Sequence, residues 1–215
     1  MTRRERFERF IAYFSETMPV AETELLYKDP YQLLVAVILS AQCTDKRVNL
    51  ITPVFFRRFP DVFTLAKASE KEVFPFISTC SYPNSKARYL VGMARTVVDN
   101  FNGTIPEDPD QLQKIPGVGR KTAHVMASVL YNRPVLAVDT HVFRVAARLG
   151  LTYRAKNPLQ TERQLVEFIP EDLIPKAHHW LILHGRYICQ ARKPKCHQCG
   201  LTDICKYYNR QNKPA

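Results

Sequence analysis

Hydrophobic residues recur along most of this chain with the spacing of an α-helix. The apolar stripe of residues 3–17 consists of Phe7, Phe10, Ile11 and Phe14. This stripe predicts an amphipathic helix. Residues 30–40 are apolar on nearly every side and begin with Pro30, directly after Asp29. Aspartate is a preferred helix N-cap and proline a preferred first helical residue. Because a helix that is apolar all round is buried, we expect the core to form around residues 30–40.

The remaining periodic segments also predict helices, separated by clusters of Pro, Asn and Ser. These segments are residues 45–59, 69–78, 85–101, 109–114, 120–131, 140–149, 160–170 and 175–189. Thr161 and Gln164 have the spacing of a capping box, in which two side chains cap the start of a helix. Residues 133–139 have the pattern of one short strand. Glycine-bounded alternating runs are otherwise nearly absent, so we predict an all-α protein.

The charge balance points to a nucleic-acid partner. The chain has 31 lysines and arginines against 20 aspartates and glutamates, a net charge of +11. Such an excess favours nucleic acid first and an anionic membrane surface second; a generically basic soluble protein is the alternative. The longest apolar run, residues 33–39, is far shorter than the ~20 residues that span a bilayer. The N-terminus has no secretory pattern, so we expect a reducing compartment, no membrane association and a cytoplasmic, nucleoid-associated protein.

Four of the six cysteines lie close together near the C-terminus. Cys189, Cys196, Cys199 and Cys205 follow the spacing C-x6-C-x2-C-x5-C. In a reducing compartment such a group holds a metal far more often than disulfides, and four thiolates suit either zinc or a four-iron cluster. Cys43 and Cys80 stand alone in the sequence, which is typical of small buried apolar residues.

The loop between the first two of these four cysteines is basic. It contains Arg192, Lys193 and Lys195 and no acidic residue. A metal core would present these charges rigidly to phosphates. The alternative is a solvated basic loop beside an anionic cluster.

Residues 109–131 have the pattern of a helix–hairpin–helix. A short helix is followed by the turn at residues 115–119, which contains Gly117 and Gly119, and by a helix that starts with Arg120. The glycines would let backbone N–H groups approach a DNA phosphate without an intervening side chain. Non-catalytic DNA-binding modules use the same hairpin, so this pattern predicts phosphate binding and leaves enzymatic activity open.

Lys121 and Asp139 are the candidates for chemistry. Lys121 lies in the first turn of a predicted helix, where the helix dipole and Arg120 both disfavour an ammonium ion. A lysine that loses its proton can attack a carbonyl or aldehyde carbon and form a Schiff base. The alternative is a lysine that only contacts phosphate. Asp139 precedes a helix as an N-cap does, and its carboxylate could also take a proton or stabilise a cationic sugar.

Five motifs, taken in order, resemble the endonuclease III family of helix–hairpin–helix DNA glycosylases. They are SAQCTD (40–45), IPGVGRKTA (115–123), AVDTHVFRV (137–145), HHWLILHGRYIC (178–189) and the four-cysteine spacing. The resemblance covers nearly the whole chain, and the motifs are highly specific in combination. It implies a base-excision repair enzyme that removes oxidised or ring-saturated pyrimidines and cleaves abasic sites by β-elimination through a lysine Schiff base.

The resemblance also implies roles for single residues. Lys121 matches the nucleophile, Asp139 the catalytic aspartate, and Gln42 a residue that fills the duplex gap left by a flipped-out base. The four grouped cysteines match the ligands of a [4Fe-4S] cluster. The implied partner is double-stranded DNA with a damaged base or an abasic site, and we expect a monomer.

The architecture implied by the resemblance has two lobes. A six-helix domain at residues 23–133 carries the hairpin, and a discontinuous iron–sulfur cluster domain consists of residues 1–22 and 134–215. Lys121 and Asp139 are then expected to face one cleft between the lobes.

One departure from the family concerns a loop that wedges into the opposite DNA strand. The family often has GLYNSKA there, and this chain has CSYPNSKA at residues 80–87. Tyr82 replaces the apolar wedge residue and Pro83 stiffens the loop, which puts the opposite-base preference in question. Two alternatives stay open: a monofunctional adenine-type glycosylase that uses water in place of an amine, and a non-enzymatic DNA-binding module held by zinc.

Overall fold

The structure is a computed structural model that describes residues 1–212. Every regular element in that range is helical and no strand forms there, so the all-α prediction is confirmed. Residues 133–139 contain no strand, because their buried stretch finds no partner strand. Residues 213–215, the end of the expected cluster domain, lie outside the described residues. No helix within residues 1–212 has the length and apolar character needed to cross a membrane.

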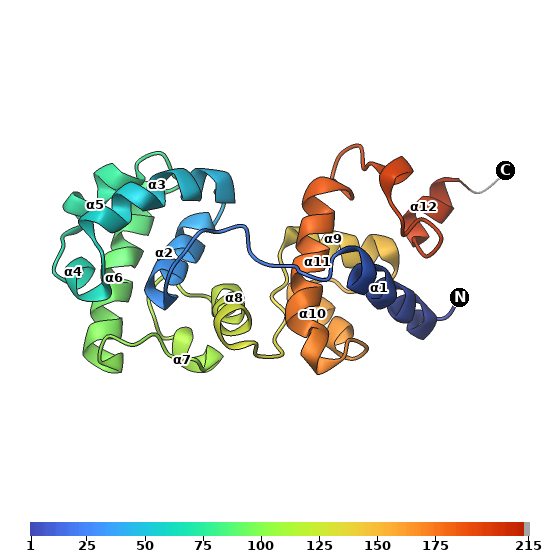
Figure 1. The fold of residues 1–215 in the computed structure, drawn as a ribbon, viewed down its shortest axis with the longest axis horizontal. Coiled ribbons are helices and arrows are strands. Elements are labelled where there is room, and N and C mark those ends of the chain that lie inside the picture. Colours follow the sequence, from blue (N-terminus) through green and yellow to red (C-terminus); the bar gives the residue numbers. More distant parts are fainter. Residues whose placement is uncertain (213–215) are drawn as a thin grey trace. The chain divides into compact units, whose positions relative to one another are not determined.

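The helices form two compact units, labelled along the chain in Figure 1. The unit Thr23–Tyr131 contains α2 (Pro30–Ser40), α3 (Asp45–Arg58), α4 (Val62–Ala66), α5 (Glu70–Ile77), α6 (Pro83–Phe101), α7 (Pro109–Leu112) and α8 (Arg120–Tyr131). The other unit joins Met1–Glu22 to the chain from Asn132 onward. It contains α1 (Arg3–Thr17), α9 (Thr140–Leu149), α10 (Pro158–Val166), α11 (Ile174–Tyr187), α12 (Lys206–Gln211) and two short 3₁₀ helices, η1 (Glu171–Leu173) and η2 (Cys196–Gln198).

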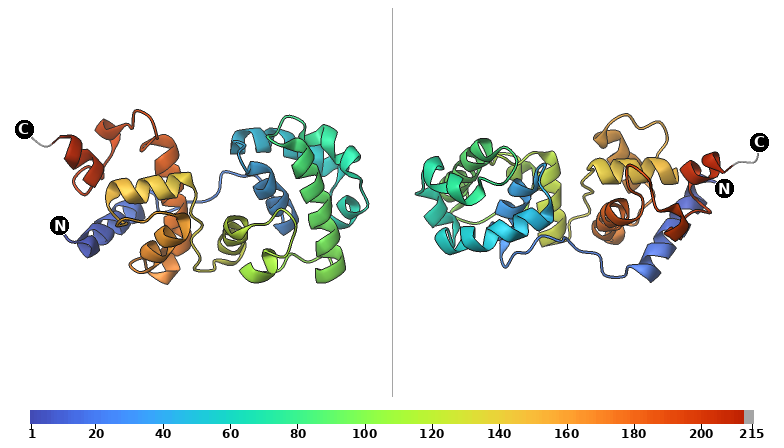
Figure 2. Two further views of the ribbon diagram at one scale, coloured as in Figure 1. Left: turned by 180° about the vertical axis from the view of Figure 1, so that it is seen from behind. Right: turned by 90° about the horizontal axis from the view of Figure 1, so that it is seen from above.

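Helix α2 is the centre of the unit Thr23–Tyr131. Its residues from Leu33 to Leu39 are all buried, and α3, α6 and α8 pack around it, as the views in Figure 2 also show. Asp29 caps the helix as predicted, because its Oδ1 accepts a hydrogen bond of 2.8 Å from the backbone N–H of Gln32. Burial of an all-apolar helix therefore organises this unit, as the sequence indicates.

Helix α1 supplies the aromatic core of the other unit. Phe7, Phe10 and Phe14 are buried as the stripe predicts, and only Ile11 stays partly exposed. The Phe14 ring stacks on Trp180 of α11 with 5.7 Å between ring centroids. Stacked aromatic pairs contribute about 0.5–1.5 kcal/mol beyond the area they bury. The Trp180 indole N–H also donates to the carbonyl of Met18, which is 162 residues earlier in the chain. The first helix therefore shares one core with α11.

The capping box expected at Thr161 and Gln164 is wrong. Helix α10 begins at Pro158, and Asn157 is its N-cap, with Oδ1 accepting from the Gln160 N–H at 2.9 Å. Thr161 lies one turn inside the helix, fully buried, and its hydroxyl has no hydrogen-bond partner. The pair of a capping Asn and an N1 Pro starts the helix earlier than the threonine could, which removes the box.

This assignment predicts opposite effects for two substitutions on α10. We expect Asn157→Ala to lower the free energy of unfolding by about 1 kcal/mol, because it removes the cap. Thr161→Val should leave that free energy unchanged or raise it slightly, because the lost hydroxyl is buried without a partner. Thermal unfolding followed by circular dichroism measures both. A Thr161→Val variant destabilised as much as Asn157→Ala would contradict the assignment.

Candidate functional site

The predicted hairpin forms between α7 and α8, and its two glycines lie in different surroundings. Ile115 and Val118 are buried and anchor the turn, with the Val118 N–H donating to the Ile115 carbonyl at 3.0 Å. Gly117 has φ +81°, and a Cβ there would lie 2.8 Å from the Cβ of Tyr89. Gly119 faces open space, with no atom within 4 Å of the position its Cβ would take. A phosphate could therefore approach the backbone at Gly119 without meeting a side chain.

Lys121 lies in the first turn of α8, as predicted. The Ala123 N–H donates to the Gly119 carbonyl at 2.9 Å, so Gly119 holds the N-cap position and the helix starts at Arg120. The side chains of Arg120 and Lys121 are exposed. The opposite face of α8 is buried through Ala123, His124, Met126, Ala127 and Ser128. Burial of that face fixes the rotation of the helix, so the two cations stay at the solvent side of its positive dipole end.

Asp139 caps α9, as the sequence indicates. Its Oδ1 accepts hydrogen bonds of 2.8 Å from the backbone N–H groups of His141 and Val142. Oδ2 makes no hydrogen bond within the described residues, and the side chain is half-buried. His178 fixes the chain just before it, because its Nδ1 lies 2.8 Å from the Ala137 carbonyl oxygen. One carboxylate oxygen therefore holds the helix and the other is available to a substrate.

Lys121 and Asp139 belong to different units of the structure. Each is fixed within its own unit by the helix at whose start it lies. Their approach across one shared cleft stays a prediction.

Gln42 and Tyr82 occupy two turns that are joined by a hydrogen bond. The Ser81 hydroxyl donates to the Gln42 carbonyl at 2.6 Å, although the two residues are 39 positions apart. Gln42 has φ +54° and Tyr82 φ +56°, and both side chains are exposed. The left-handed conformation costs a residue with a side chain about 1–2 kcal/mol. Strain of this kind persists where the surrounding structure imposes it and is concentrated at functional sites.

Lys86 is the residue that imposes the geometry of the Gln42 turn. It is only 4% exposed, and its Nζ donates to the carbonyls of Leu39 and Ala41 at 2.8 and 2.7 Å. These carbonyls end α2 directly before Gln42, where a helix leaves acceptors unpaired. Burial lowers the pKa of Lys86 below the usual lysine range. The sequence analysis missed this residue.

A signal for the burial of Lys86 was present in the sequence. Lys86 precedes Leu90, Met93 and Val97 with the i, i+4, i+7, i+11 spacing of one helix face, and these residues are buried. A lysine in line with an apolar stripe is a candidate for a buried donor, because buried charges need hydrogen-bond partners.

The four grouped cysteines lie in the unit that contains α1, and all are free thiols. Donors are close to their sulfur atoms. Arg148 Nη1 lies 3.5 Å from Cys189 Sγ, and the Tyr208 N–H lies 3.4 Å from Cys205 Sγ. Hydrogen bonds to sulfur suit thiolates, and in iron–sulfur proteins they tune the cluster.

The chemistry of this donor set fits a four-iron cluster. Burial raises the pKa of Cys199 to about 11 and also raises the pKa of Cys205, so a bare site would keep protons that metal binding removes. Among residues 1–212 no three His, Cys, Asp or Glu side chains are grouped closely enough to hold one metal ion. A four-iron cluster has a different requirement, because its cysteines bind separate irons and not one ion.

Arg148 of α9 holds the first cysteine loop against the rest of the unit. Its Nη1 donates to the Gln190 carbonyl at 2.6 Å and its Nη2 to the Ala191 carbonyl at 3.0 Å. Its guanidinium also lies 4.5 Å from the ring centroid of Tyr207. The loop beyond it exposes Arg192, Lys193 and Lys195. The predicted basic loop is thus exposed and tied at its base.

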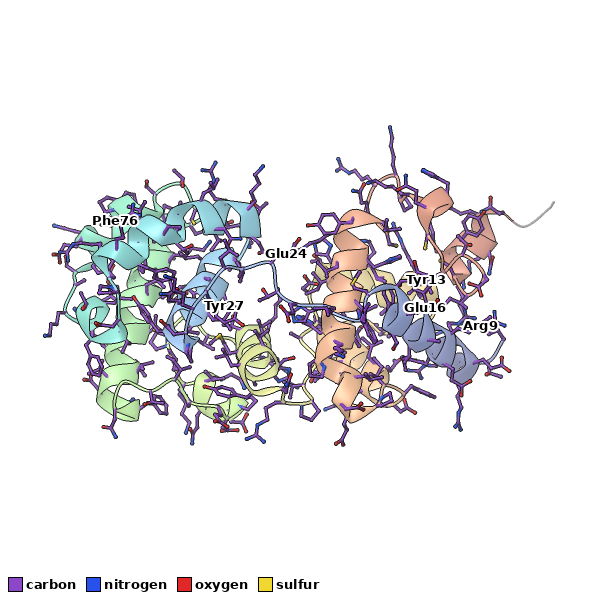
Figure 3. The ribbon with its side chains drawn as sticks, in the orientation of Figure 1. Arg9, Tyr13, Glu16, Glu24, Tyr27 and Phe76 are labelled. Carbon is purple, nitrogen blue, oxygen red and sulfur yellow. The ribbon has the colours of Figure 1, made fainter. Side chains whose placement is uncertain are left out.

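Helix α1 supports the later cysteines. Arg9 and Tyr13, both labelled on α1 in Figure 3, reach the segment that carries Cys199 and Cys205. Arg9 Nη1 pairs with Asp203 Oδ2 at 2.7 Å, and the Tyr13 ring packs so closely on Gly200 that a side chain there would have to displace the ring.

Comparison with known families matches both parts of the chain. Residues 35–171 match the family described as "HhH-GPD superfamily base excision DNA repair protein". Residues 189–205, which run from the first grouped cysteine to the last, match the "Iron-sulfur binding domain of endonuclease III".

Relatives and solved structures agree with these matches. The chain is 45% identical over 196 residues to an endonuclease III of Rickettsia felis, covering 91% of this chain and 92% of that protein. It is 39% identical over 207 residues to an endonuclease III of Escherichia coli K12, covering 96% and 97%. The structure of a trapped covalent intermediate of endonuclease III with DNA superposes with a TM-score of 0.93 at 35% identity, covering 99% of this chain and all of that one.

The hydrogen bonds of Lys86 predict a stability defect that its exposed neighbour does not share. Lys86→Met should lower the free energy of unfolding by about 1–3 kcal/mol, because two carbonyls lose their donor inside the protein. Arg88→Met, at an exposed position of the same helix, is the matched control and should change it by less than about 0.5 kcal/mol. Urea unfolding of both variants measures the difference. Equal midpoints for the two would show that Lys86 does not cap α2.

Proposed function

This chain belongs to the endonuclease III family, within the HhH-GPD superfamily of base excision DNA repair proteins, and we propose that Lys121 and Asp139 carry its chemistry. The protein is a DNA glycosylase and abasic-site lyase with a [4Fe-4S] cluster, and DNA is its partner. The observation that carries the proposal is the exposed Lys121 at the start of α8, directly beside the open backbone of Gly119.

DNA binding starts at the backbone. The N–H groups around Gly119 and the side chain of Arg120 contact a phosphate of the damaged strand, where a helix N-terminus favours an anion. Arg192, Lys193 and Lys195 add phosphate contacts from the cysteine loop, and these contacts weaken as salt rises.

The damaged nucleotide then leaves the stack. Extrusion costs a few kcal/mol and is least for a base that already stacks poorly, which gives part of the selectivity. Gln42 fills the gap in the duplex. Tyr82 enters beside it from the joined turn and stacks on a neighbouring base, in the place where the family often has an apolar residue.

Lys121 is the nucleophile. Its neutral amine attacks C1′ of the sugar, a C–N bond forms and the damaged base departs. The ring opens to a protonated Schiff base, which acidifies the C2′ hydrogens. Loss of a C2′ proton expels the 3′ phosphate, and β-elimination cuts the strand on the 3′ side of the lesion. An amine in this role is consistent with the lyase activity of the family.

Asp139 serves as the proton acceptor and as the negative charge of the site. Its Oδ2 takes a proton from the attacking amine or stabilises the cationic sugar, while Oδ1 keeps its two bonds to the start of α9. The same residue thereby caps a helix and serves the reaction.

The cluster ligands are the four grouped cysteines. When bound, the cluster supplies iron–thiolate bonds that tie residues 189–205 into one rigid segment. Arg148 fixes the base of that segment, so the basic side chains reach the phosphates from a defined position.

The finer assignments complete the proposal. The lesions are oxidised or ring-saturated pyrimidines and abasic sites, the protein acts as a monomer, and it works in the cytoplasm on nucleoid DNA. The sequence alone also allowed a monofunctional adenine-type glycosylase that uses water in place of Lys121 and a zinc-held binding module, and neither agrees with the endonuclease III match.

A borohydride trap tests the nucleophile. The protein is incubated with a duplex that contains an abasic site, borohydride is added, and a denaturing gel detects covalent complexes. We expect an adduct with the wild type and none with Lys121→Ala, because only the amine forms a reducible Schiff base. Lys114→Ala removes a second exposed lysine of the same hairpin and should keep the adduct.

The trap also separates the candidate functions. Binding of the wild type to the same duplex is measured in parallel by fluorescence anisotropy. A folded protein that binds the duplex but gives no adduct contradicts the lyase and favours the water-dependent glycosylase or the binding module.

Metal content tests the ligand assignment. Cys196→Ala should lose iron and sulfide together with the visible absorption of the cluster, because one iron loses its thiolate. Cys43→Ala, whose cysteine lies in the other unit, should keep about four irons per chain. Elemental analysis measures iron and zinc in both variants. Full iron content in Cys196→Ala, or zinc in the wild type, would overturn the assignment.

A further inference from the structure

The two cysteines outside the cluster segment meet in space. Cys43 and Cys80 are 37 residues apart, and their Sγ atoms lie 3.8 Å from one another. Both are free thiols. The sequence analysis interpreted each as an isolated buried residue, and neither enters the chemistry proposed above.

These thiols lie between the two turns that are proposed to enter the duplex. Cys43 directly follows Gln42, and Cys80 precedes Tyr82 by two residues. The Ser81 hydroxyl ties the two turns at the Gln42 carbonyl, and Lys86 ties the first of them at the Ala41 carbonyl. The sulfur atoms are therefore held side by side by contacts that do not involve them.

The two thiols differ in exposure, which sets the order of their oxidation. Cys80 is buried and Cys43 is partly exposed, so a small oxidant reaches Cys43 first. Burial and the neighbouring Cys43 raise the pKa of Cys80 to about 11, and the positive charges of Lys86 and Arg47 oppose this rise. Redox-sensitive cysteines combine an accessible thiol with a second cysteine that resolves the first oxidation product.

We propose that Cys43 and Cys80 form a reversible disulfide under peroxide and that this bond weakens the binding of lesion-containing DNA. Hydrogen peroxide transfers one oxygen to the Cys43 sulfur, which becomes a sulfenic acid, and one water is released. The Cys80 thiol attacks that sulfur, the S–S bond forms, and a second water leaves. Two electrons and two protons pass from the thiols to the peroxide, and a dithiol reverses the change.

The effect on DNA follows from geometry and rests on the function proposed for the two turns. A disulfide requires an S–S distance of about 2.0 Å, so the sulfurs must approach by about 1.8 Å from their present 3.8 Å. Because each cysteine lies within two residues of the residue proposed to enter the duplex, we expect this approach to draw the two turns together. A displacement of about 1 Å at a positioned group can cost a reaction up to 10²-fold in rate, and for lesion binding we expect a smaller loss of about tenfold.

Peptide mapping of the cluster-loaded protein tests bond formation without DNA. The protein is treated with hydrogen peroxide, alkylated with iodoacetamide and digested with trypsin without reductant. Residues 29–46 and 72–86 are the tryptic peptides that contain Cys43 and Cys80. We expect them as one linked species, lighter by two hydrogens than their sum, that dithiothreitol separates. Absence of this species while Cys43 is alkylated overturns the proposal.

Binding to a duplex with a stable abasic analogue tests the consequence. Oxidised wild type should bind about tenfold more weakly than reduced protein, in line with the displacement of the turns. Dithiothreitol should restore its affinity. Cys43→Ser, treated in parallel, should not respond, which also controls for any damage to the cluster; Cys80→Ala repeats the control from the other side.

The outcomes separate this inference from the proposed function. Linked peptides with unchanged lesion binding overturn the control of DNA binding. Loss of affinity in both oxidised wild type and oxidised Cys43→Ser assigns the effect to the cluster and also overturns it. Weak lesion binding by the reduced wild type would count against the function proposed for the turns. Formation of the disulfide is judged separately, because the linked peptides are detected without DNA.

Discussion

Within residues 1–212, several cationic side chains donate hydrogen bonds to main-chain carbonyl groups far along the chain, and Lys86 and Arg148 hold functional loops in this way. They include Arg3, Arg6, Lys86, Arg95, Arg144 and Arg148. Helix ends and loops leave carbonyls without partners, and a charged donor makes a stronger hydrogen bond than a neutral one. By contrast, the ion pairs of the described residues lie at partly or largely exposed side chains, where such pairs contribute little. Part of the net charge of +11 therefore serves the fold, and only the remainder is available to DNA.

The same kind of contact explains how strained residues keep their conformation. Gln42 and Lys193 have positive φ and lie in loops without a core of their own. Lys86 fixes the chain before the first, and Arg148 fixes the chain before the second. The hydrogen bonds are made by residues that touch no DNA in the proposed complex, while the strained residues stay exposed. The residues that are proposed to contact DNA are therefore different from those that hold the loops in place. An exposed residue such as Tyr82 can then differ from the family without disturbing the loop that carries it.

The sequence predicted those features whose cause is local. The stripe of α1 and the apolar character of α2 follow from spacing alone, and Asp29 caps α2 because the capping residue and Pro30 are adjacent. The capping box failed because Asn157 and Pro158, three and four residues earlier, start the helix first. The burial of Lys86 follows from its place in line with an apolar stripe, but its carbonyl partners on α2 lie more than 40 residues earlier in the chain. Contacts between distant segments have no local signal in the sequence. They form only when the helices pack around α2.

The cysteines show the difference between a feature that the local sequence predicts and one that depends on the packed fold. The spacing of Cys189 and Cys196 with their two later partners marks a metal segment because all four ligands fall within 17 residues, so chain connectivity already brings them near one another. Cys43 and Cys80 have no such signal, since 37 residues and three helices separate them, and only the packed unit makes them neighbours. Identical side chains thus acquire different chemistry from the way they are brought together. A local set takes a cluster that rigidifies its own loop, whereas a tertiary pair at 3.8 Å joins two loops whose relative position matters. For this reason a change in the redox state of the pair acts on the geometry of the turns and not on their composition.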